Sequence, residues 1–188
     1  MSMVVKREDD QTKWHLSHRA DPRALPLANR HYTRQKIDSP QFVPPGRCIV
    51  LLTRQSDALW VTSYPLAAYV KHAWAGAWIC SLFRNESPAL ASQLIVDAVA
   101  ITRWHAERAW DGIPPLGMVT FVDPTRIRSD HPGYCYKRAG FVRVGTTRGG
   151  LIALQLKPEE MPKAHAPAGV LDVCQQVLFA PLTVGAST

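Results

Sequence analysis

The chain has 188 residues, 46% of them hydrophobic and 20% charged, which is enough for one folded domain and short for two. Its formal charge of +7 favours partners that carry phosphate, although a basic protein without such a partner fits the charge equally well. The four cysteines lack the close pairing typical of metal sites. The first residues are polar, and the longest apolar run is shorter than a membrane span. These features predict a cytoplasmic protein with reduced thiols and no membrane partner.

The first half of the chain predicts a short helix followed by strands. Residues 1–11 are polar and are expected to be disordered. Asp21-Pro22 is a favourable helix start, because aspartate caps the first turn and proline fits within it, and this helix is expected to end near Asn29. Three apolar runs then predict strands, the first two joined as a hairpin, at residues 48–53, 58–63 and 76–83.

The second half predicts a long helix and three further strands. Ser87-Pro88 begins the helix by the same rule, and apolar residues at helical spacing continue it to about Trp110. The strands are expected at residues 117–122, 141–144 and 151–156, with a short helix at 134–139. A long helix between the third and fourth strands predicts one parallel crossover in an otherwise antiparallel sheet. Residues 12–157 thus form the predicted domain, and residues 158–188 a partly ordered extension.

Polar residues follow the strand expected at 117–122. Asp123, Asp130 and His131 lie in the next loop, and Tyr136 lies at the start of the short helix. Ligands of open α/β sheets bind outside the carboxyl ends of the strands, so this segment is the best candidate for chemistry. Asp123 is either a turn residue that accepts local N–H bonds or a general base or metal ligand.

The order of the expected elements, together with Tyr136-x-x-x-Gly140-Phe141, is similar to that of the GNAT acyltransferase superfamily. The resemblance implies an α/β (α+β) fold with a mixed, mostly antiparallel central sheet flanked by helices. It also implies that Tyr136 is a general acid, the alternative being packing beside Phe141. GNAT enzymes hold the pyrophosphate of acetyl-CoA on a glycine-rich loop before the long helix. Here that place contains no glycine, Pro88 lacks an N–H, and Glu86 adds negative charge, which predicts a changed cofactor site.

A narrower resemblance is to the Mom family of phage DNA-modification proteins. Four features carry it, in chain order: His31-Tyr-Thr-Arg34, Arg84 after the central strand, Asp123-Pro124, and His131-Pro-Gly-Tyr-Cys-Tyr136. The resemblance implies conversion of adenine in double-stranded DNA to N6-carbamoylmethyladenine, which protects phage DNA from host restriction. An iron requirement has been proposed for the family, and the donor of the transferred group is unknown.

The Mom-like resemblance implies roles for individual residues. The catalytic candidates are His31, Arg84, Asp123 and Tyr136. The candidates for substrate contacts are Tyr32, Arg34, Arg126, Arg128, His131 and Lys137. His31 and Asp123 are candidate iron ligands, and whether Asp123 or Asp130 is the working carboxylate stays open. The residues alone also allow purely structural roles, in which His31 lies against a helix end and Arg84 pairs with Glu86.

Two other functions stay open from the sequence. One is an acetyl-CoA-dependent N-acyltransferase that acts on a small molecule or a modified base. The other is a non-catalytic DNA-binding module on a degenerate GNAT scaffold. The sequence does not set the oligomeric state, and a homodimer is one option. If duplex DNA is the substrate, the paired adenine must be flipped out of the helix, and Tyr64 or Trp74 is a candidate to stack on it.

Overall fold

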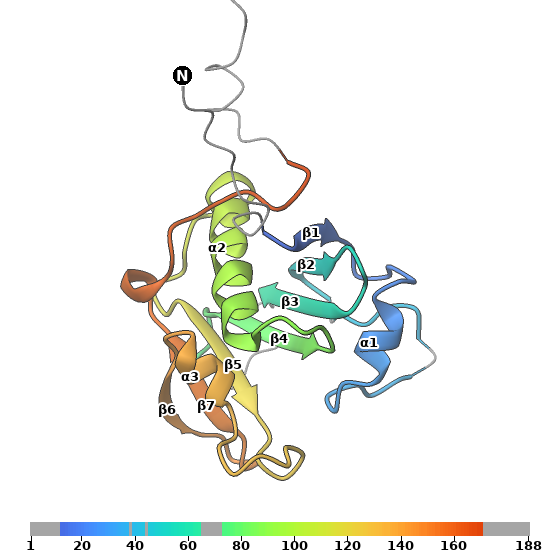
Figure 1. The fold of residues 1–188 in the computed structure, drawn as a ribbon. Helices are drawn as coiled ribbons and strands as arrows, with labels where there is room; N and C mark the ends of the chain where they lie inside the picture. Colours follow the sequence, from blue (N-terminus) through green and yellow to red (C-terminus); the bar gives the residue numbers. More distant parts are fainter. Residues whose placement is uncertain (1–11, 38, 44, 65–72, 171–188) are drawn as a thin grey trace, which may run out of the picture.

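The structure, a computed structural model, describes residues 12–37, 39–43, 45–64 and 73–170. Within this part of the chain, a sheet of seven strands has the order β1-β2-β3-β4-β5-β7-β6 (Figure 1). The strands are β1 Trp14–Ser17, β2 Arg47–Thr53, β3 Ala58–Tyr64, β4 Trp78–Asn85, β5 Met118–Val122, β6 Val142–Thr146 and β7 Ile152–Leu156. The α-helices described are α1 Leu25–Asn29, α2 Ala91–Ala109 and α3 Tyr134–Arg138, and a short 3₁₀ helix follows at Pro158–Glu160.

The pairing of the strands confirms the expected mixed, mostly antiparallel sheet flanked by helices. Among the described strands, β4 and β5 pair in parallel, and every other neighbouring pair is antiparallel. Helix α2 makes the connection between the two parallel strands, as the long apolar helix in the sequence requires.

Strands β4 and β5 pair over only part of their length. The parallel ladder joins Trp78–Cys80 to Met118–Thr120, whereas β4 continues to Asn85 and β5 continues to Val122. Each strand stays paired on its outer side, β4 with β3 and β5 with β7. The two strands therefore separate towards their carboxyl ends, and an opening forms between two well-supported edges.

The two faces of the sheet bury separate apolar clusters. On one face, α2 and α3 cover a core that includes Trp60, Trp78 and Met118. On the other face, α1 and the loop after it cover a smaller core. This second core includes Leu27, Phe42, Val43, Leu59, Val61 and Leu82. Elements therefore pack on both faces of the sheet, and residues from either face can reach the carboxyl ends of β4 and β5.

The larger differences from the sequence predictions are a missed strand and two helix starts. Strand β1 was not predicted, since four residues give too short an alternation to be recognised. The first helix begins at Leu25, because the buried Asp21 carboxylate accepts the Arg23 N–H in a preceding turn. The long helix begins at Ala91, after an uncapped Leu90, so the prediction of a start at Ser87-Pro88 was wrong.

The segment after β7 packs against α2 and reaches the β1 edge, as the orange-red trace in Figure 1 shows. Met161 is buried in the larger core, and the His165 ring lies 2.7 Å from the Asp97 carboxylate. The Ala168 N–H donates to the Trp14 carbonyl at 2.8 Å. The predicted C-terminal extension is thus ordered as far as residue 170, while residues 1–11 and 171–188 lie outside the described residues. No helix in the described part of the chain is long and apolar enough to cross a membrane.

The turn before β5 depends on a glycine, and this gives a test of the fold. Gly117 has φ +65°, and a Cβ there would lie 2.1 Å from the Leu156 carbonyl oxygen. We expect Gly117→Ala to lower the free energy of unfolding by about 3 kcal/mol or more. Gly112→Ala is the matched control, because φ is +82° there but no atom lies within 4 Å. It should cost about 1 kcal/mol. Equal losses in urea denaturation would contradict this packing.

Candidate functional site

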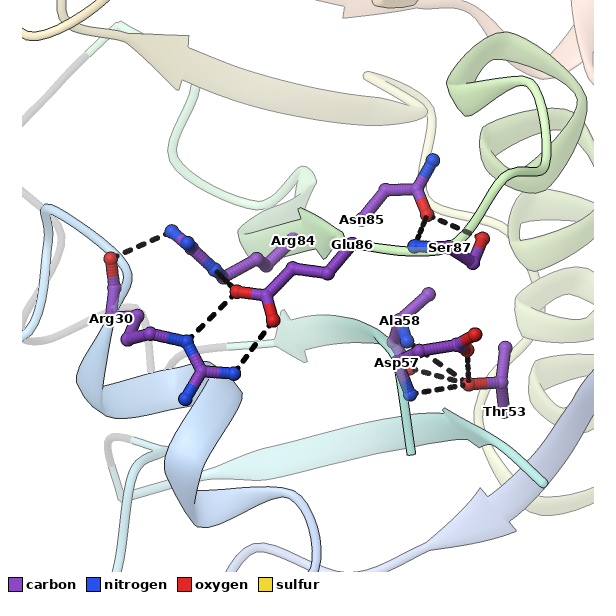
Figure 2. Close-up of polar contacts among 8 residues, drawn as sticks. All are labelled: Arg30, Thr53, Asp57, Ala58, Arg84, Asn85, Glu86 and Ser87. Carbon is purple, nitrogen blue, oxygen red and sulfur yellow. Dashed lines mark hydrogen bonds and ion pairs between the residues drawn. The ribbon is translucent and has the colours of Figure 1, made fainter. Parts of the chain in front are cut away.

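Two arginines and one glutamate join the end of α1 to the end of β4 (Figure 2). Arg30 donates from Nε and Nη2 to the two carboxylate oxygens of Glu86, at 2.8 and 2.7 Å. Arg84 donates from Nε to Glu86 Oε1 at 2.5 Å and from Nη1 to the Arg30 carbonyl at 2.7 Å. Hydrogen bonds from Arg30 and then Arg84 lower the pKa of Glu86 to about 2. We call these three residues the Arg30–Glu86–Arg84 clamp.

The β2–β3 turn holds the backbone of Glu86 in place. The Thr53 hydroxyl accepts the Asp57 and Ala58 N–H groups and donates to the Asp57 carboxylate at 2.6 Å (Figure 2). The carbonyl of Asp57 in turn accepts the Glu86 N–H at 2.7 Å. The carboxylate between the two arginines therefore sits on a backbone that is itself fixed.

His31 follows the clamp directly, and its ring stacks on Tyr32 with centroids 4.5 Å apart. His31 Nδ1 lies 2.7 Å from the Thr33 hydroxyl and 3.4 Å from the Thr33 N–H. A backbone N–H can only donate, so Nδ1 is the acceptor and the ring proton lies on Nε2. Burial, and then the charge of Arg84, lower the pKa of His31 to about 4. At neutral pH this ring is an uncharged hydrogen-bond donor.

Tyr32, in the segment after α1, contacts the end of β5. Its hydroxyl lies 3.5 Å from the Phe121 carbonyl, to which it can donate, and 3.4 Å from the Asp123 N–H, from which it can accept. Burial is the main cause of the raised pKa of Tyr32. His31, Tyr32 and Arg84 are thus brought to the opening between β4 and β5, beside Asp123.

The Asp123 carboxylate takes part in the local turn that the sequence left as one alternative. Its Oδ1 accepts the Thr125 N–H at 2.9 Å and the Thr125 hydroxyl at 2.6 Å. These bonds lower the pKa of Asp123, so the group is an anion at neutral pH. Both bonds end on Oδ1. Asp130 is exposed, and it is the backbone of Asp123 that touches Tyr32.

Tyr136 is buried at the point where β4 and β5 separate. Its hydroxyl lies 3.4 Å from Cys80 Sγ, and Cys80 and Thr120 are the last paired residues of the two strands. Burial raises the pKa of Tyr136 well above its usual range and that of the Cys80 thiol to about 12. Both groups therefore keep their protons at neutral pH. The packing alternative is also real, since the Tyr136 ring contacts Phe83 and Phe141 edge-on.

Of the other residues predicted to contact the substrate, Arg34 is bonded within the loop after α1 and the rest are exposed. Arg34 donates to Asn29 Oδ1, to the Gln41 carbonyl at 2.9 Å and to the Ser39 carbonyl, so its guanidinium holds the loop after α1. The remaining side chains, all exposed, belong to Arg126, Arg128, His131 and Lys137. These four lie on or beside the segment that follows β5 and are exposed to solvent.

Two residues of the site escaped the sequence analysis as functional candidates. Arg30 was not singled out, because its partner Glu86 lies 56 positions away in the chain. Cys80 was not singled out either, although the approach of Tyr136 gives it a place in the site. The signal for Arg30 was its position directly before His31, and for Cys80 its position within the central strand.

The loop between β4 and α2 is closed on itself. The Glu86 N–H donates to the Asp57 carbonyl at 2.7 Å, and the Ser87 N–H donates to Asn85 Oδ1 at 3.0 Å (Figure 2). The Ala89 N–H donates to Ser87 Oγ at 3.2 Å. Three N–H groups of this loop, those of Glu86, Ser87 and Ala89, are therefore already engaged, whereas the Leu90 side chain makes no capping bond to the first turn of α2. The changed cofactor site expected from the sequence stays a prediction.

The residues present do not fit an iron centre. Among the described residues, no group of three or more His, Cys, Asp or Glu side chains is arranged to hold a metal ion. His31 Nδ1 is engaged with Thr33, and the Asp123 carboxylate with Thr125.

Comparison of the chain with known protein families, with curated proteins and with solved structures returns no match.

The protonation of His31 tests the electrostatics of this site. We expect its ring carbons to titrate near pH 4 in an NMR experiment. The unfolded ring, with a pKa near 6.5, binds a proton before the folded ring does, so His31 makes stability fall as pH drops from 6.5 towards 4. Arg84→Gln should raise the pKa of His31, because the nearby positive charge is removed.

Arg47→Gln is the control for this titration. Arg47 pairs with Asp111 at the opposite end of the sheet from Arg84, so the His31 titration should not change. A His31 ring that titrates near pH 6.5 in the unaltered protein would show that the ring is not held as described.

Proposed function

We propose that the chain is a DNA-modifying transferase that acts on adenine, converting it to N6-carbamoylmethyladenine and protecting phage DNA from restriction. The observation that carries the proposal is the convergence of His31, Tyr32 and Arg84 on the opening between β4 and β5. These residues come from two segments that the Mom-like resemblance singled out separately. The resemblance supplies the adenine product, and the geometry supports a shared site for it.

The charges around the opening suit a nucleic-acid substrate. Cationic side chains are exposed on the segment after β5 and on α3, at Arg126, Arg128, Lys137 and Arg138. Such side chains contact phosphates and orient the DNA without reading its sequence. The half-buried Phe121 and Trp74 rings meet edge-on, and the Phe121 carbonyl lies 3.5 Å from the Tyr32 hydroxyl. These rings provide apolar surface for an unstacked base.

Each side chain at the opening has a role that its protonation state allows. In the proposed reaction the adenine amine attacks the electrophilic carbon of the donor, an N–C bond forms, and the donor's leaving group departs with its electron pair. The uncharged His31 donates from Nε2, and Arg84 adds positive charge, where negative charge develops on the donor. The Asp123 anion is the available acceptor for the proton that the amine loses.

The closed loop before α2 weighs against the acetyl-CoA-dependent alternative. A pyrophosphate there would have to displace the Asn85 and Ser87 contacts and approach the Glu86 carboxylate. Calorimetry with acetyl-CoA addresses this alternative directly, and tight binding would favour it over nucleobase modification by another donor.

Nucleoside mass spectrometry of DNA from a bacterium that expresses the chain tests the proposal. We expect an adenine adduct with the mass of the carbamoylmethyl group. His31→Ala should reduce it at least about 100-fold, because a positioned donor to developing charge is lost. Arg47→Gln, far from the opening, should leave the adduct unchanged.

Two results would contradict the proposal. The first is unmodified DNA in cells that contain soluble, folded protein. The second is an adduct that persists in full with His31→Ala, which would place the chemistry elsewhere. Intact cellular protection without any adduct, retained in Asp123→Ala and Tyr136→Phe, would instead favour the non-catalytic DNA-binding module.

A further inference from the structure

A cavity of about 420 Å³ lies on the α1 face of the sheet, next to the opening between β4 and β5. Its floor includes Ser81 and Leu82 of β4, and its wall is the loop after α1. Thr33 lines the cavity and also bonds His31 Nδ1 at 2.7 Å, so the cavity and the site share a boundary. The volume is within the range of roughly 300–1,000 Å³ that small-molecule sites occupy.

The lining of the cavity combines an apolar base with a polar rim. Leu82, Phe42 and Val43 are buried in the smaller core, whereas Gln35 and Gln41 are exposed at the rim. The Arg34 guanidinium holds the wall in place through its bonds to the loop carbonyls. A nucleobase has apolar faces and polar edges, so a preformed hollow of this composition suits a base removed from its stack.

The Ser81 hydroxyl can distinguish bases that carry an exocyclic amine from those that do not. It is the extra residue of a β-bulge, because Val61 pairs with Leu82 while Thr62 pairs with Cys80. Its hydroxyl lies 2.9 Å from the Ser63 hydroxyl and 3.4 Å from the Val61 carbonyl. A hydroxyl that donates to the carbonyl and accepts from Ser63 keeps one further lone pair. That lone pair can accept an exocyclic amine, which adenine has and thymine lacks.

We infer that this cavity receives the flipped base of the DNA substrate and that Ser81 accepts one N–H of its exocyclic amine. The inference rests on the proposed function and adds the place where the base binds. The second N–H of the amine is then directed to the neighbouring opening, where His31 and Arg84 lie. The rim glutamines provide amide groups for the ring edge of the base.

The test compares binding of oligodeoxyadenylate and oligodeoxythymidylate of equal length to the full chain. The two probes carry the same phosphates, so a difference in affinity reports the base. We expect the adenine probe to bind about tenfold more tightly, the value of one well-placed base contact. Gln41→Trp, which fills the cavity from its exposed rim, should abolish this preference. Ser81→Ala, a small change within a supported strand, should reduce it about threefold.

Gln93→Trp is the matched control, because Gln93 is an exposed glutamine that lines a different cavity, on α2. It should keep the full preference for adenine. Equal binding of the two probes by the unaltered protein would overturn the inference, and so would a preference that survives both Gln41→Trp and Ser81→Ala. Circular dichroism checks that each variant is folded. If Gln41→Trp does not fold, the adenine preference of Ser81→Ala decides whether the base binds in the cavity.

The inference and the proposed function fail in different ways. An adenine adduct in cellular DNA, with no base preference in the binding experiment, removes the cavity assignment and leaves the function. A base preference that depends on Gln41 and Ser81, with no adduct, removes the transferase proposal and leaves a base-binding cavity.

Discussion

The site depends on one interaction, the placement of the Glu86 carboxylate between Arg30 and Arg84. It fixes the end of α1 against the end of β4, and the next residue in the chain, His31, takes its position from that contact. Glu86 also lies in the loop before α2, where its N–H donates to the Asp57 carbonyl at 2.7 Å. A partly exposed ion pair contributes little to stability, but a bidentate pair between two elements sets geometry well. The clamp therefore accounts for the location of the His31–Tyr32 stack.

The incomplete pairing of β4 and β5 is the second constraint. Beyond Cys80 and Thr120 the two strands separate, so side chains from either face of the sheet can reach the gap. Tyr136 approaches from the face that α2 covers, and Tyr32 comes from the loop after α1. A hydroxyl with a strongly raised pKa and an uncharged imidazole thus lie at one opening, where neither group carries charge at neutral pH.

Most of the fold could be predicted from the sequence, because apolar runs and glycine or proline boundaries are local signals. The predictions failed where the start of a helix depends on which of several local hydrogen bonds a side chain makes. Asn85 and Ser87 hold the loop that a helix-capping rule assigned to α2, and Asp21 bonds Arg23 instead of starting a helix. The clustering of His31 with Arg84 could be expected only through the resemblance. The contacts that produce it, between Arg30 and Glu86 and between Tyr32 and β5, join residues 56 and 89 positions apart, and no local pattern encodes them.

Photo-cross-linking tests most directly the claim that a base enters the opening between β4 and β5. The full chain is irradiated with a duplex oligonucleotide that carries a photoreactive adenine analogue, and the attached peptides are identified by mass spectrometry. The account predicts attachment to Tyr32 and to the loop after α1 that lines the cavity with Ser81. Attachment confined to the far side of the molecule, around Gln93 and Lys163 on the α2 face, would contradict it.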